Sequence, residues 1–173
     1  MTRPPLGVYV GLSSITAVYG GLLAAVVWGG LWVPAAAEPR ALTAPITALV
    51  GLTAVVWVMM FAFRNVAVAR GVASIHYYQC YASADAPPEW IERPARTFMN
   101  LLEVPVLFYV VCLLMLAAGG FDRVQLTLAW IYVVTRLIHA VLYIAHNYVP
   151  TRMTAYICSC ITLAVMWIRF AGS

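Results

Sequence analysis

The sequence predicts an all-α integral membrane protein, and three observations lead to that prediction. Apolar residues make up 64% of the 173 residues and charged residues only 9%, whereas a soluble domain needs roughly 25% charged residues to cover its surface. The mean hydropathy is +0.90. Five apolar segments approach the ~20 residues that a helix needs to cross a bilayer. Lipid is therefore the partner that the composition implies, and the sequence lacks the basic stripe that binds nucleic acid.

Short runs rich in proline, glycine and charged residues separate the five segments. The expected helices cover residues 6–33, 45–63 (or up to 70), 94–118, 124–145 and 152–170. Part of the long connection, residues 71–92, is expected to extend the second helix beyond the membrane. Pro105 lies inside the third segment and is expected to kink it, which membrane helices tolerate.

The positions of the arginines predict the orientation of the chain. With five spans, one side of the membrane carries Arg3, Arg64, Arg70, Arg93, Arg96 and Arg152, and the other carries Arg40, Arg123 and Arg169. Cytoplasmic segments carry an excess of basic residues, so the first side is expected to be cytoplasmic. The amino terminus then lies in the cytoplasm and the carboxyl terminus on the opposite side.

Two of the expected helices carry polar side chains on one face. The third has Arg96, Asn100 and Glu103, and the fourth has Arg136, His139 and Tyr143. Spacings of three and four residues place each set on one side of its helix. A charged group at mid-bilayer costs about 2.5–3.5 kcal/mol on the insertion scale, so these groups should face protein or water.

Glu103 and Arg136 are expected at matching depths, ~14–15 Å below the same surface, and we hypothesise that they pair within one chain or between neighbours. Two interpretations of the polar stripes stay open. The polar groups either fix helix register in lipid, or they line a cavity that opens to the cytoplasm and to which Arg152 contributes. Such a cavity would suit a small anionic or zwitterionic ligand, since the planar fork of arginine binds both oxygens of a carboxylate.

These polar residues resemble the signatures of a known family. Arg96, Asn100 and Glu103, followed by Pro105, resemble the second-helix motif of the MAPEG superfamily, the membrane-associated proteins in eicosanoid and glutathione metabolism. A later series is most similar to the microsomal prostaglandin E synthase branch of that superfamily: Arg136, His139, Tyr143, Pro150, Arg152 and Tyr156. The resemblance covers about residues 45–170, four of the five segments.

The resemblance implies a MAPEG-like four-helix bundle, residues 45–173, that assembles as a homotrimer. It is preceded by an extra N-terminal transmembrane helix and loop, residues 1–44. Glutathione, as co-substrate, would bind between subunits near the cytosolic side. The matching glutathione contacts are Arg70 (or, as second choice, Arg64), Arg96, Asn100, Glu103, Arg136 and His139, and the implied catalytic residues are Arg152, Tyr143 and Tyr156.

Arg152 is the residue expected to help hold a thiolate. A free thiol has a pKa of about 8.5, and a nearby guanidinium favours its charged form. The sequence departs from the family pattern at Met153, where the prostaglandin synthases have a serine implicated in thiol activation, and Pro105 follows Glu103 at a shorter interval. The four cysteines are expected to be packing residues, and no metal site is expected.

Three functions are weighed on these grounds. The first is a glutathione-dependent transferase or peroxidase acting on lipophilic electrophiles or lipid hydroperoxides that arrive from the bilayer. The second is a non-catalytic scaffold or accessory subunit of a larger membrane complex, which Met153 and the extra helix favour. The third is an electron-transfer protein with a quinone, or with haem on His139 or His146, since histidine is a common ligand of haem iron. A multi-pass protein of the bacterial inner membrane is expected in each case.

Overall fold

The computed structural model describes residues 6–28, 37–81 and 86–172, and all the regular structure within them is helical. The elements are α1 (Leu6–Trp28), η1 (Pro39–Leu42), α2 (Thr43–Ala69), α3 (Ile75–Cys80), α4 (Glu89–Leu102), α5 (Pro105–Ala117), α6 (Arg123–Ala145) and α7 (Val149–Ala171). Within these described residues, four stretches are long and apolar enough to cross a membrane: 39–69, 89–117, 123–145 and 149–171. A shorter apolar helix, Val10–Ala25, precedes them. The predicted fold class is confirmed, and the protein is an integral, multi-pass membrane protein.

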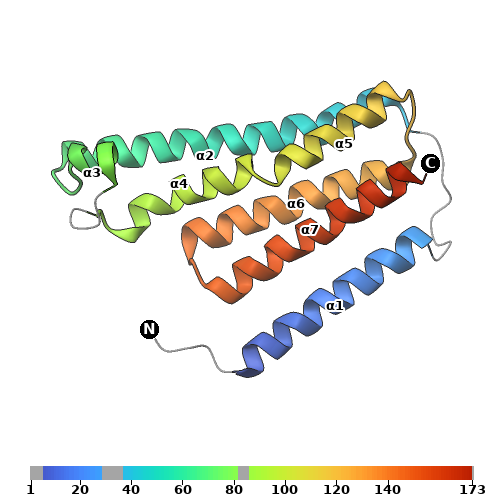
Figure 1. Ribbon diagram of the computed structural model, residues 1–173, viewed down its shortest axis with the longest axis horizontal. Coiled ribbons are helices and arrows are strands. Elements are labelled where there is room, and N and C mark those ends of the chain that lie inside the picture. The colour runs from blue at the N-terminus through green and yellow to red at the C-terminus, as the bar shows by residue number, and fades with distance from the viewer. Residues whose placement is uncertain (1–5, 29–36, 82–85, 173) are drawn as a thin grey trace.

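The long helices lie side by side along the longest axis (Figure 1). The chain reverses at each turn, so the end of α2, the start of α4 and the α6–α7 turn share one end of the bundle, beside α3. We call this the α3 end. The η1 turn, the α5–α6 turn and the end of α7 lie at the opposite end.

The core is built mainly where α4, α5, α6 and α7 meet. Phe108 of α5 and Tyr132 of α6 are fully buried and their rings stack with centroids 4.7 Å apart. The side-chain N–H of Gln125 on α6 donates to the carbonyl of Met166 on α7, 3.1 Å away. Helix α2 buries only Pro45, Leu49, Val56 and Ala67, so most of its surface remains open to lipid or to another protein.

Helix α1 packs mainly against α7 and is tied to it by a hydrogen bond. The hydroxyls of Tyr19 and Thr162 lie 2.6 Å apart, and the Thr162 hydroxyl donates its only proton to the carbonyl of Cys158. Tyr19 is therefore the donor to Thr162. Leu23 is the buried apolar residue of α1 that joins the core.

The connection after α2 differs from the prediction. The start of the connection, which is expected to extend the second helix, does not do so, because Gly71 adopts φ +67 and the N–H groups of Val72 and Ala73 turn back to the carbonyl of Ala67. A left-handed residue of this kind ends a helix, and glycine adopts it without strain. Ser74 then caps the separate helix α3 by accepting from the N–H of His76.

The third predicted helix is broken rather than bent. Helix α4 ends at Leu102 and α5 begins at Pro105, with Glu103 at φ −86 and ψ −94 between them. Proline has no N–H to offer the carbonyl of Leu101 and its ring crowds the preceding turn. Pro105 therefore interrupts the helix, a stronger effect than the expected kink, and the break leaves backbone carbonyls in the middle of the bundle without helical partners.

Candidate functional site

Arg136 of α6 is completely buried and supports the break between α4 and α5. In a continuous helix the carbonyl of Asn100 would accept from the N–H of Val104, but α4 ends before that bond forms. The Arg136 Nη2 donates to this carbonyl at 2.6 Å, and Nη1 lies 3.4 Å from the hydroxyl of Ser159. Arg136 thus supplies the hydrogen bond that the proline break removes from the backbone.

Two aromatic rings flank the same guanidinium. Its carbon lies 5.1 Å from the ring centroid of Tyr156 and 5.9 Å from that of Tyr132. A cation placed near aromatic faces is stabilised by their quadrupoles, and more so when water is excluded. Arg136 Nε is buried without a hydrogen-bond partner in the described part of the chain. A carbonyl, a hydroxyl and two rings therefore replace the carboxylate partner that the sequence suggested.

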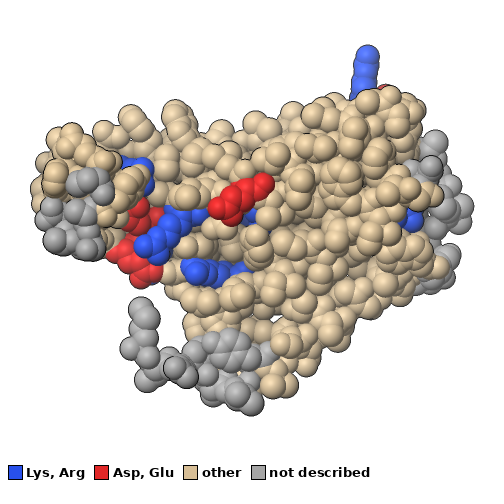
Figure 2. Space-filling model, viewed as in Figure 1, with Lys and Arg blue, Asp and Glu red and all other residues tan. Residues whose placement is uncertain are grey.

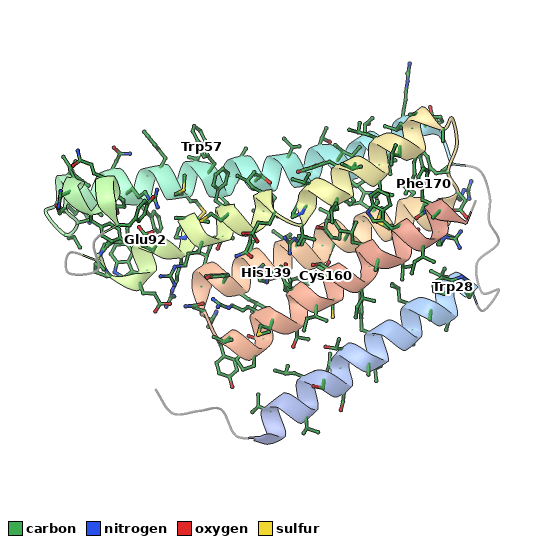
Figure 3. All side chains as sticks on the ribbon, in the orientation of Figure 1. Trp28, Trp57, Glu92, His139, Cys160 and Phe170 are labelled. Carbon is green, nitrogen blue, oxygen red and sulfur yellow. The ribbon has the colours of Figure 1, made fainter. Side chains whose placement is uncertain are left out.

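His139 lies one turn further along α6, toward the α3 end (Figure 3). It is 4% exposed, and its Nδ1 lies 2.9 Å from the carbonyl of Arg152. Because a carbonyl can only accept, Nδ1 carries the proton and donates, and Nε2 of the neutral ring is left as an acceptor. This Nε2 is buried without a partner among the described residues. The ring centroids of Tyr156 and Tyr143 are 5.5 and 5.9 Å away.

Arg152, at the start of α7, lies beyond His139 toward the α3 end. Its guanidinium carbon lies 4.0 Å from the ring centroid of Tyr143, and Nη1 donates to the side-chain oxygen of Asn147. Asn147 in turn donates to the carboxylate of Glu89 on α4. Arg93, also on α4, lies 3.4 Å from the carbonyls of Ile144 and Ala145 at the end of α6. The α6–α7 turn is therefore fastened to α4 by polar side chains.

The structure brings most of the predicted site residues into one connected set. This central cluster runs from mid-membrane to the α3 end and consists of Asn100 (through its carbonyl), Arg136, His139, Tyr143, Arg152 and Tyr156. It contains two guanidinium groups. The ion pairs found in the described residues involve other side chains: Arg64 with Glu92, Arg93 with Glu89, and Arg169 with Asp122. The cluster therefore carries a positive charge that no ion pair within the described segments neutralises.

Three predicted residues lie outside this cluster. Arg96 and Glu103 are exposed on the surface of the single chain, and the side-chain amide of Asn100 folds back to the carbonyl of Arg96. Arg70 ends α2 and is exposed as well. The hypothesised pair of Glu103 and Arg136 is not formed within one chain, since Arg136 is buried against other groups. Glu103 is exposed at the helix break, although its carboxylate is close enough to Tyr156 to interact with it electrostatically.

An ion pair between Arg64 of α2 and Glu92 of α4 lies beside α3. Arg64 donates to Glu92 at 3.2 Å, and its guanidinium carbon lies 5.0 Å from the ring centroid of Tyr78. Burial raises the pKa of the Tyr78 phenol, and the Glu92 carboxylate raises it further, while Arg64 acts in the opposite direction. A cavity of about 460 Å³ adjoins Arg64, Asn65 and Tyr78. Arg70 and Arg64 are the first and second choices for a glutathione contact on this helix, and their surroundings differ. Arg64 is bound to Glu92 of α4, whereas Arg70 is exposed.

Sequence reasoning missed Ser159 and Asn147. Ser159 is fully buried and contacts Arg136. Its position was available as a signal, because Arg152, Tyr156 and Ser159 are spaced four and then three apart on one helix face. Asn147 has φ +47 in the α6–α7 turn, a conformation that asparagine tolerates, and no periodic pattern marks it.

The charged side chains visible on one face of the molecule gather toward the α3 end (Figure 2). Elsewhere in that view few Lys, Arg, Asp or Glu side chains reach the surface, apart from basic side chains at the opposite end. His, Cys, Asp and Glu side chains of the described segments form no group of three or more that could hold a metal ion. The arginine and tyrosine side chains at the α3 end can donate hydrogen bonds and can bind an anion.

Comparison with known proteins assigns the family. The sequence model of the MAPEG family matches residues 42–172, which begin at the end of η1 and include α2 to α7. Helix α1 lies outside the matched stretch. None of the curated proteins and none of the solved structures compared with the chain matches it. Because the family model covers well over half of the chain, the protein belongs to the MAPEG family.

Proposed function

We propose that this protein binds glutathione at the α3 end and uses its thiol in a transferase or peroxidase reaction on a lipophilic substrate. The observation that carries the proposal is the central cluster, which holds two guanidinium groups without a carboxylate partner from the described residues. Glutathione offers two carboxylates and a thiol. Membership of the MAPEG family supports a glutathione-related activity in a membrane.

Each residue has a role that its position suggests. Arg152 is only partly buried, so it can meet an anion that approaches from the α3 end. Its guanidinium would favour the thiolate form of glutathione. The Tyr143 and Tyr156 hydroxyls would donate hydrogen bonds to the sulfur or to the leaving group. Met153 is 51% exposed and has no hydroxyl, so activation would depend on the guanidinium rather than on a serine.

The reaction needs only the thiol and the electrophile. In the transferase reaction the thiolate sulfur forms a bond to an electrophilic carbon and the leaving group departs with its electron pair. In the peroxidase reaction two glutathione molecules are oxidised to the disulfide while a hydroperoxide is reduced to an alcohol and water. The apolar substrate would enter sideways from the bilayer, and glutathione from the cytoplasm.

A homotrimer would complete this site. Arg70, Arg96 and Glu103 are exposed in the single chain, and α2 leaves most of its surface uncovered. A neighbouring subunit packed on α2 would bring such residues to the cluster. We also propose that the α3 end faces the cytoplasm and that the membrane is a bacterial inner membrane. The second motif suggests that the prostaglandin E synthases are the nearer branch of the family.

Calorimetric titration of the detergent-purified protein with glutathione tests the proposal. We expect saturable binding and conjugation of chlorodinitrobenzene or reduction of cumene hydroperoxide. Arg152→Met should abolish thiolate formation, measured by ultraviolet difference absorbance, and should weaken binding. Arg123→Met is the matched control, because Arg123 is exposed at the opposite end. Absence of glutathione binding at millimolar concentration would remove the proposal.

A non-catalytic scaffold is the second candidate, and α1 favours it. Helix α1 lies outside the family match and exposes much of its length, which offers another protein a surface to pack on. Purification in a mild detergent separates the two candidates. A stoichiometric membrane complex that binds no glutathione would support the scaffold.

A further inference from the structure

Two cavities lie in line between α1 and the α6–α7 pair, outside the central cluster. The first, of about 260 Å³, is bounded by Tyr19 and Leu22 of α1 and by Val124 and Ile131 of α6, among others. The second, of about 370 Å³, is bounded by Leu12 and Tyr19 of α1 and by residues of α6 and α7: Thr135, Ile138, Leu142, Thr151, Thr154, Ala155 and Cys158. Tyr19 lines both. We call the two together the α1 groove.

The dimensions of the α1 groove are those of a hydrocarbon chain. Its lining residues on α6 run from Val124 to Leu142, which at 1.5 Å per residue is about 27 Å, close to the ~30 Å hydrocarbon thickness of a bilayer. A helix about 10 Å across and equally long would occupy roughly 2,000 Å³. Cavities of about 260 and 370 Å³ suit a slender occupant such as a hydrocarbon chain better than they suit a packed helix.

The lining is chemically apolar even though hydroxyl groups contribute to it. The threonine hydroxyls all donate to carbonyls of their own helices: Thr127 to Arg123, Thr135 to Ile131 and Tyr132, Thr151 to Tyr148, and Thr154 to Pro150. The Tyr19 hydroxyl is engaged with Thr162. A polar ligand would find no free hydroxyl proton on these walls. Methyl and methylene groups are what the groove presents.

We infer that the α1 groove binds an acyl chain of a membrane phospholipid, which fills the space between α1 and α6. The groove lies within the membrane-spanning length of α6, and α1 packs against α7 while standing away from α6. An apolar cavity does not hold water, and an empty one forfeits the contacts of its walls. Acyl chains are the surrounding solvent, so one of them can enter between the helices.

Photolabelling in nanodiscs tests this inference. The full chain is reconstituted with a phosphatidylcholine that carries a diazirine in its acyl chain, and labelled positions are mapped by peptide mass spectrometry. We expect labelling of Ile138, Leu142 and Ala155 to exceed that of the outward face of α1 around Val10 and Ala17. Equal labelling of the two surfaces would overturn the inference, because ordinary boundary lipid labels both.

A matched pair of variants sharpens the test. Ala155→Phe places a ring in the α1 groove and should lower its labelling several-fold. Ala17→Phe adds the same ring on the exposed face of α1, where it lines neither cavity, and should leave groove labelling unchanged. Unchanged labelling in a folded Ala155→Phe protein would overturn the inference, as would crosslinks from these positions to a second copy of the chain. If Ala155→Phe does not fold, the comparison of the two wild-type surfaces decides.

Discussion

The role of Arg136 at the helix break can be measured with a double-mutant cycle. Pro105→Ala restores a backbone N–H at position 105 and lets α4 and α5 join, so Val104 can donate to the carbonyl of Asn100. Arg136→Met removes the present donor to that carbonyl, which lies 2.6 Å away. The two substitutions should therefore be coupled, because each changes which group serves the same acceptor.

The size of the expected coupling energy depends only on those effects of Arg136→Met that differ between the wild-type and Pro105→Ala backgrounds. With Pro105 in place, Arg136→Met leaves the buried carbonyl unsatisfied at a cost of about 1–3 kcal/mol. It also loses the contacts to Tyr132 and Tyr156 and removes a buried charge, but these effects are the same in both backgrounds and cancel in the cycle. Arg136→Met should therefore cost about 1–3 kcal/mol less in the Pro105→Ala background.

Reversible unfolding in mixed dodecylmaltoside and sodium dodecyl sulfate micelles, followed by circular dichroism, gives the four free energies of unfolding. Arg169→Met with Pro105→Ala is the control pair, because Arg169 binds Asp122 near the opposite end. That pair should be additive within about 0.5 kcal/mol. If Arg136→Met and Pro105→Ala are equally additive, Arg136 does not support the break and the reasoning fails.

Three further predictions concern stability and use thermal unfolding in detergent. Tyr19→Phe should cost about 0.6 kcal/mol, the average for a hydrogen bond between membrane helices, and Thr162→Val should then add little; fully additive losses would show that the two hydroxyls act separately. Asp122→Ala should cost about 2 kcal/mol, since the residue caps α6 and forms an ion pair, and Asp122→Asn should recover about 1 kcal/mol by keeping the cap; equal losses in both would refute the cap. Gly71→Ala should cost about 1–2 kcal/mol because its backbone is left-handed, with a φ of +67. Gly51→Ala, in the interior of α2 with open space around it, should not destabilise; equal effects of the two glycine substitutions would contradict this.

The membrane-spanning fold was accessible from the sequence because hydropathy and helix length decide it. The turns at Gly119 and around Pro150 fell where the sequence suggested, since glycine and proline restrict the backbone locally. Helix α3 was not predicted. The residues just after α2 lie beyond its apolar span, so a single left-handed glycine and the cap by Ser74 determine the path of residues 71–80.

The candidate site was predictable only along continuous helices. Residues spaced three and four apart on α6 and α7 do meet, and this brings His139, Tyr143 and Tyr156 together. The same rule fails for Glu103, because the helix that would orient it ends one residue earlier. Spacing predicts a shared face only while the hydrogen-bonded ladder continues.

The two arginines of the central cluster differ in how accessible their guanidinium groups are to a ligand. Arg136 is fully buried, donates to Asn100 and Ser159, and lies between two rings, so its contacts resemble those of a structural group. Removing it would disturb the break whether or not a ligand is present. Arg152 contacts Tyr143 and Asn147 but is only partly buried at the end of the bundle. An anion can reach Arg152 without displacing a backbone contact. Substitution of Arg152 should therefore abolish glutathione binding with a smaller loss of stability than substitution of Arg136, which should lower both together.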